Sequence, residues 1–378
     1  MFLKRLNLTN FRNYSTLEVN FDQRPTILLG NNAVGKSNLL EAIYLLSTAK
    51  SLRVETEDEL IKKEEEFTKI EGFLVDSPSA HSGLSPSGLK TGGDIELLVI
   101  INKPTRDVLF RKKVLVNGIG RRIVDFIGNL PAVIFYPADI NLVTGPPSLR
   151  RWHLDLALAQ IDPEYEHSSN LASLSYKKAL TLYEQFLTAR NRVLKRIREG
   201  FGKPNELDYW TEELVKLAKV ISDKRKVFFE FINALERPLG EFMFEYKPSE
   251  MSVDRLLETN GREVAAAATL IGPHRDDFDI VTSGRNLRRF GSRGEQRIAT
   301  LAFKLLQLEY MAFSLGKRPI LLLDDVFSEL DAPHRAHVVG VVSKQQTIIA
   351  TVDLENIPKD FLDSARILRV EDGHVHVN

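Results

Sequence analysis

The sequence is 378 residues long, which exceeds one ordinary domain and predicts either one large domain with an excursion or two domains. Its 51 basic and 51 acidic residues balance, so bulk charge indicates neither nucleic-acid nor membrane binding, and any such surface must come from local clusters. The lack of cysteine excludes disulfides, cysteine-ligated zinc and a thiol nucleophile, and it fits a reducing cytoplasm.

The N-terminal residues 1–13 have no apolar core long enough for a signal peptide, and we expect no later segment to span a bilayer. We therefore expect a soluble, cytoplasmic protein with no membrane partner. Residues 2–30 predict three short strands, because two alternating apolar stretches are followed by a continuous apolar run at 26–29, typical of a strand covered on both faces. Apolar residues recur at helical spacing from residue 39, so the glycine-rich segment between lies at a strand-to-helix turn.

That segment, GNNAVGKS, matches the phosphate-binding loop pattern of a glycine, four residues and Gly-Lys-Ser. Gly30 and Gly35 allow backbone conformations that turn successive amide hydrogens toward phosphates. We expect Lys36 to contact the β and γ phosphates and Ser37 to ligate Mg²⁺, at the positive end of the helix. The predicted nucleotide-binding segment is Gly30, Asn31, Asn32, Ala33, Val34, Gly35, Lys36 and Ser37.

Further strands are predicted at 69–75, 94–101 and 107–116, the last ending in a turn at 116–118. The stretch 76–93, rich in serine, glycine and proline, predicts a flexible surface loop to which we assign no function.

From about residue 165 two long apolar series at helical spacing are separated by a break, GFGKPNE, at 200–206. Such a pair predicts an antiparallel helical hairpin. The hairpin is either a projecting arm that meets DNA or a partner, or a plain helical subdomain packed on itself.

From about residue 264 the pattern returns to α/β, with a helix predicted at 294–313 and strands at 320–323 and 347–351. The nucleotide fold is therefore split around the helical segment. We predict an N-terminal part of the head at 1–160, an inserted helical lobe at 161–263 and a C-terminal part of the head at 264–378.

A second motif, ILLLDDVFSELD at 320–331, places two acids at the end of a buried strand. We expect Asp324 to hold Mg²⁺ and Asp325 to orient or deprotonate the attacking water, since positioning supplies most of the catalysis in phosphoryl transfer. The alternative for paired acids at a strand end is a solvated turn.

A third motif, FGSRGEQR at 290–297, places a serine and a glycine directly before a helix. A hydroxyl, a backbone amide and a helix dipole together make a second phosphate-binding arrangement. The alternative is an ordinary N-cap with Glu295 in the first turn. One phosphate loop and a second such helix start raise the prospect of a nucleotide site shared between two subunits.

These three motifs in this order resemble the ABC-type ATPases of the SMC class, and the finer details resemble the bacterial RecF family of recombination mediators. The resemblance covers nearly the whole chain. Besides the motifs above, the segments that carry it are LTNFRNY (8–14), GNNAVGKSNLLEAIYLLSTAKSLR (30–53), FYPADINLVTGPPSLRRWHLD (135–155), YEQFLTARNRVLK (183–195) and IGPHRDDF (271–278).

The resemblance implies an α/β fold, an ABC-type P-loop ATPase head with an inserted helical lobe bearing a short antiparallel helical arm. It implies ATP and Mg²⁺ as cofactors, a homodimer formed on ATP binding, weak DNA-stimulated ATP hydrolysis, and DNA binding at gaps or single-strand to double-strand junctions. It also implies RecR, with RecO, as a partner in loading RecA, and a role in SOS induction.

Motif matching carries residue roles over to this chain. The implied catalytic residues are Lys36, Asp324 and Asp325, and the implied metal ligands are Ser37 and Asp324. Besides the phosphate loop, the implied nucleotide contacts are Arg12, Ser292 and Gly294, the last two acting on the γ-phosphate held by the other subunit.

The chain departs from the family pattern at a few positions. The pattern favours Gln at 293 and 295, where this chain has Arg and Glu, and an acid at 138, where it has Ala. Arg293 either adds charge at the shared phosphate or faces DNA. The insert at 76–93 is also unlike a compact family member.

Other charged segments have two interpretations each. His274, Arg275, Asp276 and Asp277 form either a polar network near the nucleotide or a salt-bridged surface turn. The basic runs at 190–198 and 284–294 either contact DNA phosphates or are solvated faces. No interleaving of aromatic and basic residues indicates base stacking, which favours recognition of the DNA backbone.

Two alternative functions stay open. An SMC or double-strand-break-repair ATPase would carry long coiled coils, against which the short arm argues. A non-hydrolysing, ATP-dependent DNA scaffold would not need the complete set of Lys36, Ser37, Asp324 and Asp325.

Overall fold

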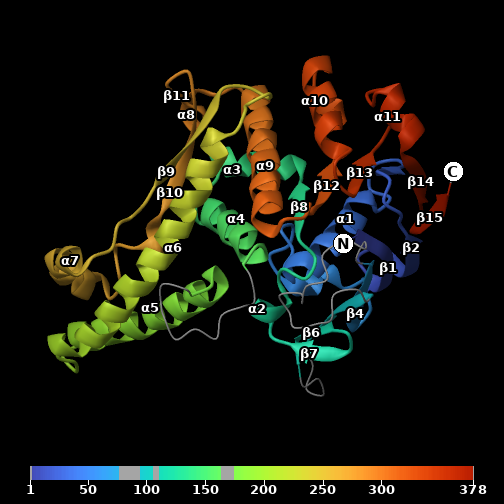
Figure 1. Ribbon diagram of the computed structural model, residues 1–378. Helices are drawn as coiled ribbons and strands as arrows, with labels where there is room; N and C mark the ends of the chain where they lie inside the picture. Colours follow the sequence, from blue (N-terminus) through green and yellow to red (C-terminus); the bar gives the residue numbers. More distant parts are fainter. Residues whose placement is uncertain (1, 76–93, 105–109, 163–173, 378) are drawn as a thin grey trace. The chain divides into compact units, whose positions relative to one another are not determined.

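The computed structural model describes residues 2–75, 94–104, 110–162 and 174–377, so the predicted loop at 76–93 lies outside the described residues. The chain forms two compact units. Unit 1 comprises residues 1–139, 238–240 and 297–378, and unit 2 comprises residues 140–237 and 241–296. Figure 1 labels most of the helices and strands of both.

An antiparallel sheet in unit 1 has the strand order β2-β1-β4-β5-β6-β7. Its strands are β1 (Phe2–Phe11), β2 (Tyr14–Asn20), β4 (Phe67–Val75), β5 (Ile95–Asn102), β6 (Lys112–Val116) and β7 (Ile119–Arg121). The predicted turn after β6 is present, since Asn117 and Gly118 have positive φ angles of 50° and 74°, as a tight two-residue hairpin requires. The strands predicted from residue 2 to residue 116 are therefore confirmed where the structure describes them.

A second sheet in unit 1 has the order β15-β14-β3-β13-β12-β8, and its five strands other than β15 run parallel. The strands are β3 (Thr26–Leu29), β8 (Ala132–Phe135), β12 (Ile320–Asp324), β13 (Thr347–Thr351), β14 (Arg366–Glu371) and β15 (His374–Val377). The central strands β12 and β13 are buried along their whole length, which explains their uninterrupted apolar sequences.

Helix α1 (Lys36–Thr48) contacts strands of both sheets, β4 and β5 in one and β8, β12 and β13 in the other. Its residues from Leu39 to Thr48 are all buried, as expected for a helix that is apolar on every side. Gly72 of β4 permits this approach, because a Cβ there would lie 2.5 Å from Leu46 Cδ1. The core of unit 1 thus holds the helix that follows the phosphate loop.

The remaining helices of unit 1 are short except α9, whose first residues belong to unit 2. They are η1 (Glu57–Leu60), α2 (Ile123–Phe126), η2 (Pro137–Ile140), α9 (Arg293–Leu315), η6 (Phe327–Glu329), α10 (Ala332–Val342) and α11 (Lys359–Ser364). On length and hydropathy α9 could span a bilayer, contrary to our expectation, but 67% of its most apolar window is buried inside the protein. It is therefore a core helix, because the core of a folded domain favours the same apolar side chains as a bilayer does.

Unit 2 contains a helical hairpin and a small antiparallel sheet. Helices α5 (Tyr176–Arg198) and α6 (Asp208–Ala234) lie side by side and are joined by a short connection that contains η4 (Pro204–Leu207), which confirms the predicted hairpin (Figure 1). The sheet has the order β11-β10-β9, with β9 (Phe242–Lys247), β10 (Asp277–Thr282) and β11 (Arg285–Asn286). The other elements are α3 (Asn141–Thr144), α4 (Pro147–Gln160), α7 (Val253–Ala266), η5 (Pro273–Arg275) and α8 (Leu287–Phe290).

The compact units divide at different residues from the predicted parts, which placed boundaries at 160 and 263. Helix α4 contacts α5 and β10, and β10 pairs along its whole length with β9, so the segments 140–160 and 264–296 lie in unit 2. Sequence spacing could not show this pairing because 29 residues separate the two strands.

Three fully buried arginines organise unit 2. Arg150 forms two hydrogen bonds to Asp277, of 2.6 and 3.0 Å, and Arg190 lies 2.7 Å from Glu263. Arg225 donates to the carboxylates of Asp155 and Asp276, each at 2.7 Å. Burial of this kind requires complete pairing. The interpretation of the whole run 190–198 as an exposed basic face is therefore wrong for Arg190.

Candidate nucleotide site

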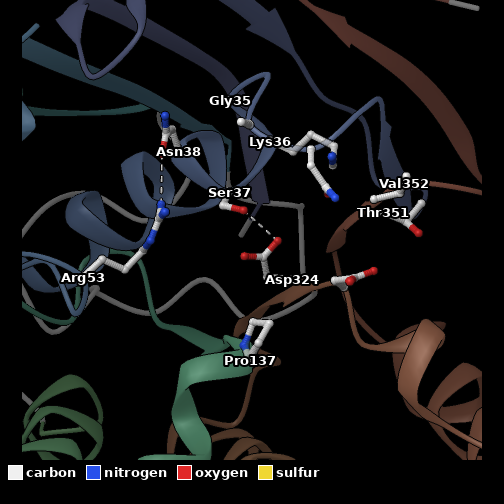
Figure 2. Close-up of a pocket in the computed structure, with 12 residues that line it drawn as sticks. Gly35, Lys36, Ser37, Asn38, Arg53, Pro137, Asp324, Thr351 and Val352 are labelled. Carbon is white, nitrogen blue, oxygen red and sulfur yellow. Dashed lines mark hydrogen bonds between the residues drawn. The ribbon is translucent and has the colours of Figure 1, made fainter.

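The carboxyl ends of four neighbouring parallel strands surround a pocket of about 300 Å³ in unit 1 (Figure 2). Ligands of open α/β sheets bind at this edge. The loop after β3 and the start of α1 supply half of the lining. Arg53 and residues at or just after the ends of β8, β12 and β13 supply the other half. The lining residues are Asn32, Ala33, Gly35, Lys36, Ser37, Asn38, Arg53, Pro137, Asp324, Asp325, Thr351 and Val352.

The loop between β3 and α1 has the conformation that its two glycines permit. Gly35 has a φ of 118°, and a Cβ at this position would lie 2.5 Å from Tyr14 Oη. A Cβ at Gly30 would lie 2.3 Å from the carbonyl oxygen of Val370. Both positions therefore require glycine, and the loop is held against β2 and β14 while its amides begin α1.

Lys36 is buried, and its ammonium donates to the carbonyl oxygens of Gly30 and Asn31, each at 2.7 Å. Burial lowers the pKa of Lys36, while the charges of Asp324 and Asp325 act in the opposite direction. The cation is thus held inside its own loop at the edge of the pocket.

Ser37 and Asp324 meet across the pocket, with Ser37 Oγ donating to Asp324 Oδ1 at 2.9 Å (Figure 2). Burial raises the pKa of Asp324, and the hydrogen bond from Ser37 opposes this. Asp325 has a φ of 51°, and its amide donates to the carbonyl oxygen of Ala350 at 2.9 Å. A solvated turn is therefore the wrong interpretation of Asp324, and the two oxygens suit Mg²⁺.

Among the residues that the structure describes, no group of three or more His, Cys, Asp or Glu side chains could hold a metal ion. A nucleotide-dependent magnesium site needs only one or two protein oxygens, because phosphates and water complete the octahedron. Ser37 and Asp324 would hold such an ion.

Arg12 does not line this pocket but an adjoining hollow of about 560 Å³. Asn38 and Arg53 line both, so the two spaces are neighbours. The remaining predicted loop residues, Gly30, Asn31 and Val34, line a third hollow of about 630 Å³ beside β14.

Sequence reasoning missed Arg53 and Glu41. Arg53 Nη1 donates to Asn38 Oδ1 at 3.0 Å and to Glu41 Oε2 at 3.2 Å, and its guanidinium lies 5.6 Å from the ring centre of Tyr136. A charged residue inside the apolar run LLEAIYLL was the available signal for Glu41, because a carboxylate in a buried helix needs partners.

The predicted signature segment 290–297 belongs to unit 2 up to Gln296 and to unit 1 at Arg297, whereas all residues that line the pocket with Lys36 and Asp324 belong to unit 1. Ser292 is the N-cap of α9, since its Oγ accepts from the amide of Glu295 at 3.2 Å, and the Glu295 carboxylate accepts from the amide of Ser292 at 2.8 Å. This is a capping box. Gly294 has open space, with no atom within 4 Å of where a Cβ would be.

The segment 274–277 takes part in a polar network around the buried Asp276 rather than forming only a surface turn, although Arg275 is exposed. Asp276 is 1% exposed and accepts from Arg225 and from the amide of Ser249, each at 2.7 Å. None of the four residues lines the phosphate pocket. His274 Nδ1 lies 2.7 Å from Tyr183 Oη, and its Nε2 lies 3.0 Å from the carbonyl oxygen of Thr269.

Known proteins with similar sequences include members of one family of DNA repair proteins. The family model described as the RecF/RecN/SMC N terminal domain matches residues 2–82. The DNA replication and repair protein RecF of Geobacillus kaustophilus is 35% identical over 399 residues, covering 99% of each chain.

Solved structures of a RecF protein and of an SMC head also match this chain. The structure of the recombination mediator protein RecF with ATP, in the RecFOR pathway, is 26% identical with a TM-score of 0.81 and covers 100% of this chain and 99% of that one. An SMC head bound to the C-winged helix domain of ScpA is 15% identical with a TM-score of 0.50, covers 100% of this chain and 98% of that one, and shares the fold. The expected α/β fold of an ABC-type ATPase head with an added helical region is thereby confirmed.

Proposed function

The chain belongs to the RecF family of DNA replication and repair proteins, and from that premise we propose that it is an ATP-dependent DNA-binding protein of recombinational repair. In this proposal ATP closes a homodimer on DNA at gaps or single-strand to double-strand junctions, and slow, DNA-stimulated hydrolysis reopens it. The closed dimer acts with RecR and RecO in loading RecA, and so supports SOS induction. In this proposal the protein acts in the cytoplasm.

One observation carries the nucleotide part of the proposal, namely the meeting of Lys36, Ser37 and Asp324 at the ends of β3 and β12. The phosphates of ATP would occupy the pocket of about 300 Å³, and its nucleoside would reach the adjoining hollow that Arg12 lines. Asn38 and Arg53, which line both spaces, lie where the two ends of the nucleotide join.

In the proposed mechanism each side chain has one task. Mg²⁺, when bound, neutralises phosphate charge and polarises the bond that breaks. Lys36 transfers its hydrogen bonds from the loop carbonyls to phosphate oxygens, and Ser37 and Asp324 hold the ion. Asp325 orients the attacking water. Because positioning supplies most of this catalysis, weak turnover is expected until every group is in place.

The exposed signature segment supports the proposed dimer. Ser292, Arg293 and Gly294 are exposed at the start of α9, which is 23 residues long. In the proposal they meet the γ-phosphate held by a second copy of the chain, where the helix start and the Arg293 cation favour an anion. The capping box leaves the Ser292 hydroxyl hydrogen free to donate, since its oxygen is the acceptor in that bond.

Sedimentation tests the shared site. We expect the wild type to dimerise with ATP and a gapped duplex, and Ser292→Arg to stay monomeric because the larger side chain blocks the phosphate. Ser252→Arg is the matched control, since Ser252 is likewise the N-cap of a helix in unit 2, accepting from the amide of Arg255 at 3.3 Å. It loses the same capping energy, about 1 kcal/mol, and keeps the ATP-dependent dimer.

Equal dimerisation of the two arginine variants would contradict the shared site. Phosphate release from the same samples distinguishes a weak ATPase from a non-hydrolysing scaffold. Stimulation by gapped DNA, lost in Asp325→Asn, is the expected result, and no release with any DNA would favour the scaffold.

A further inference from the structure

Glu41 is a buried carboxylate on α1, five residues after Lys36, and its side chain is 1% exposed. It accepts two hydrogen bonds from Arg12, with Nε at 3.0 Å and Nη2 at 2.8 Å, and a third from Arg53 Nη1 at 3.2 Å. The hydroxyl of Ser51 donates to the same carboxylate. One carboxylate therefore joins two cations that are distant from each other in the sequence.

Both guanidinium groups extend from this buried anchor toward the nucleotide spaces. Their side chains are 19% exposed for Arg12 and 34% exposed for Arg53. Arg12 lines the hollow of about 560 Å³, and Arg53 lines both that hollow and the phosphate pocket. In Figure 2 Arg53 points to Asn38, beside the loop.

The backbone at Arg12 supports the same placement. Its φ is 53°, its amide donates to the carbonyl oxygen of Leu60 at 2.9 Å, and its Nη1 donates to the carbonyl oxygen of Glu59 at 3.0 Å. A left-handed conformation costs a non-glycine residue about 1 kcal/mol or more and persists only where the surroundings impose it.

Electrostatics makes both arginines depend on Glu41. Two guanidinium groups held beside each other repel, and a carboxylate between them removes that repulsion and fixes each fork by charge-assisted hydrogen bonds. Without the negative charge the two cations would separate and rotate into solvent. The ion pairs lie at the edge of a pocket that the phosphate loop also lines. Loss of the Glu41 charge would therefore move arginine side chains at the pocket without unfolding it.

We propose that Glu41 is a positioning residue that holds Arg12 and Arg53 in the orientation that binds the nucleotide. The inference rests on the proposed function, because it requires ATP in these two spaces. Glu41 itself touches no nucleotide and acts only through the two arginines.

Isothermal titration with ATP and Mg²⁺ tests this in the full chain. We expect Glu41→Gln to raise the Kd for ATP by roughly tenfold, since it keeps the shape and removes the charge that orders two charge-assisted pairs. In a chain that already carries Arg12→Ala and Arg53→Ala, adding Glu41→Gln should leave the Kd unchanged. A role in stability alone would lower the Tm without this dependence on the arginines.

Glu309→Gln is the matched control. Glu309 accepts two hydrogen bonds of 2.7 Å from Arg318 in the same unit, and neither residue lines the phosphate pocket or the hollow beside it. It should keep the wild-type Kd. If Glu41→Gln does not fold, Glu41→Asp, which keeps the charge and withdraws it by one methylene, replaces it.

A wild-type Kd in the folded Glu41 variant would overturn the proposal, as would an equal loss of affinity with and without the arginines. Failure of the proposed function gives a different result, because then the wild type would bind ATP no better than Lys36→Ala.

Discussion

In the proposed site, Lys36 exchanges hydrogen-bond partners when a nucleotide binds. Its ammonium donates to two carbonyl oxygens of its own loop. Neutral carbonyls are weaker acceptors for an ammonium than phosphate oxygens, because a phosphate adds the attraction between opposite charges. The loop is therefore preformed, and the two carbonyl bonds keep the cation from leaving it before the phosphates arrive.

His274 gives unit 2 a pH-dependent stability. The carbonyl oxygen of Thr269 requires a proton on Nε2, so Nδ1 accepts from Tyr183 and the ring is neutral. Burial lowers the pKa of His274 below its usual 6.5. A depressed pKa contributes stability above the unfolded value, and this is lost as pH falls below about 6.5 toward the folded pKa.

We therefore expect urea unfolding at pH 7.5 and pH 5.5 to show lower stability at pH 5.5, with a slope from His274 of at most about 1.4 kcal/mol per pH unit. In His274→Gln the slope should shrink. Some slope should remain, since burial also lowers the pKa of His337. An unchanged slope in the variant would show that His274 does not titrate in this range.

Residues with a local motif were predictable, and residues with only distant partners were not. Lys36, Ser37 and Asp324 lie in two short patterns, and the structure brings them together. Arg53 lies in no recognisable sequence motif. Its partner Glu41 is 12 residues earlier in the chain, and the pocket that Arg53 lines exists only after folding.

At the scale of elements, α6 depends on the buried cation Arg225. Arg225 is 1% exposed, and its guanidinium pairs with Asp155 of α4 and with Asp276 beside β10. Removing one member of a buried ion pair leaves the others without compensation and costs about 3–5 kcal/mol. We expect Arg225→Met to lower the free energy of unfolding by this amount in urea titrations.

The control is Arg275→Met. Arg275 is exposed in the same network segment, and a surface substitution is expected to change stability by less than about 0.5 kcal/mol. If the two methionine variants unfold at the same urea concentration, the buried pairs do not stabilise unit 2.

Element type was predictable where the apolar period was clear, as in the loop-to-helix start of α1 and in the helices α5 and α6. The burial of charged side chains inside unit 2 was not predictable from the sequence. Arg190 interrupts the apolar face of α5 and so was interpreted as part of a basic surface, although Glu263 of the distant α7 neutralises it.

At the scale of the whole molecule, the nucleotide pocket belongs to unit 1 alone. Ligand binding stabilises the part that binds, by about 2.7 kcal/mol at a ligand concentration 100 times Kd. In the monomeric Ser292→Arg chain, we expect ATP to slow hydrogen exchange in α1 and β12 and to leave α5 and α6 unchanged. Equal slowing in both units would mean that they respond to the nucleotide as one body.

The order of strands in the parallel sheet determines when the protein can first function during its synthesis. In this sheet only β3 and β8 come from the first 139 residues. They are not neighbours, because β13 and β12 lie between them. Both intervening strands come from residues 320–351, so the carboxyl edge that lines the pocket is incomplete while the ribosome is still making unit 2. A nascent or prematurely terminated chain therefore carries the complete loop GNNAVGKS without Asp324, Asp325 and the residues after β13 that complete the lining of the pocket.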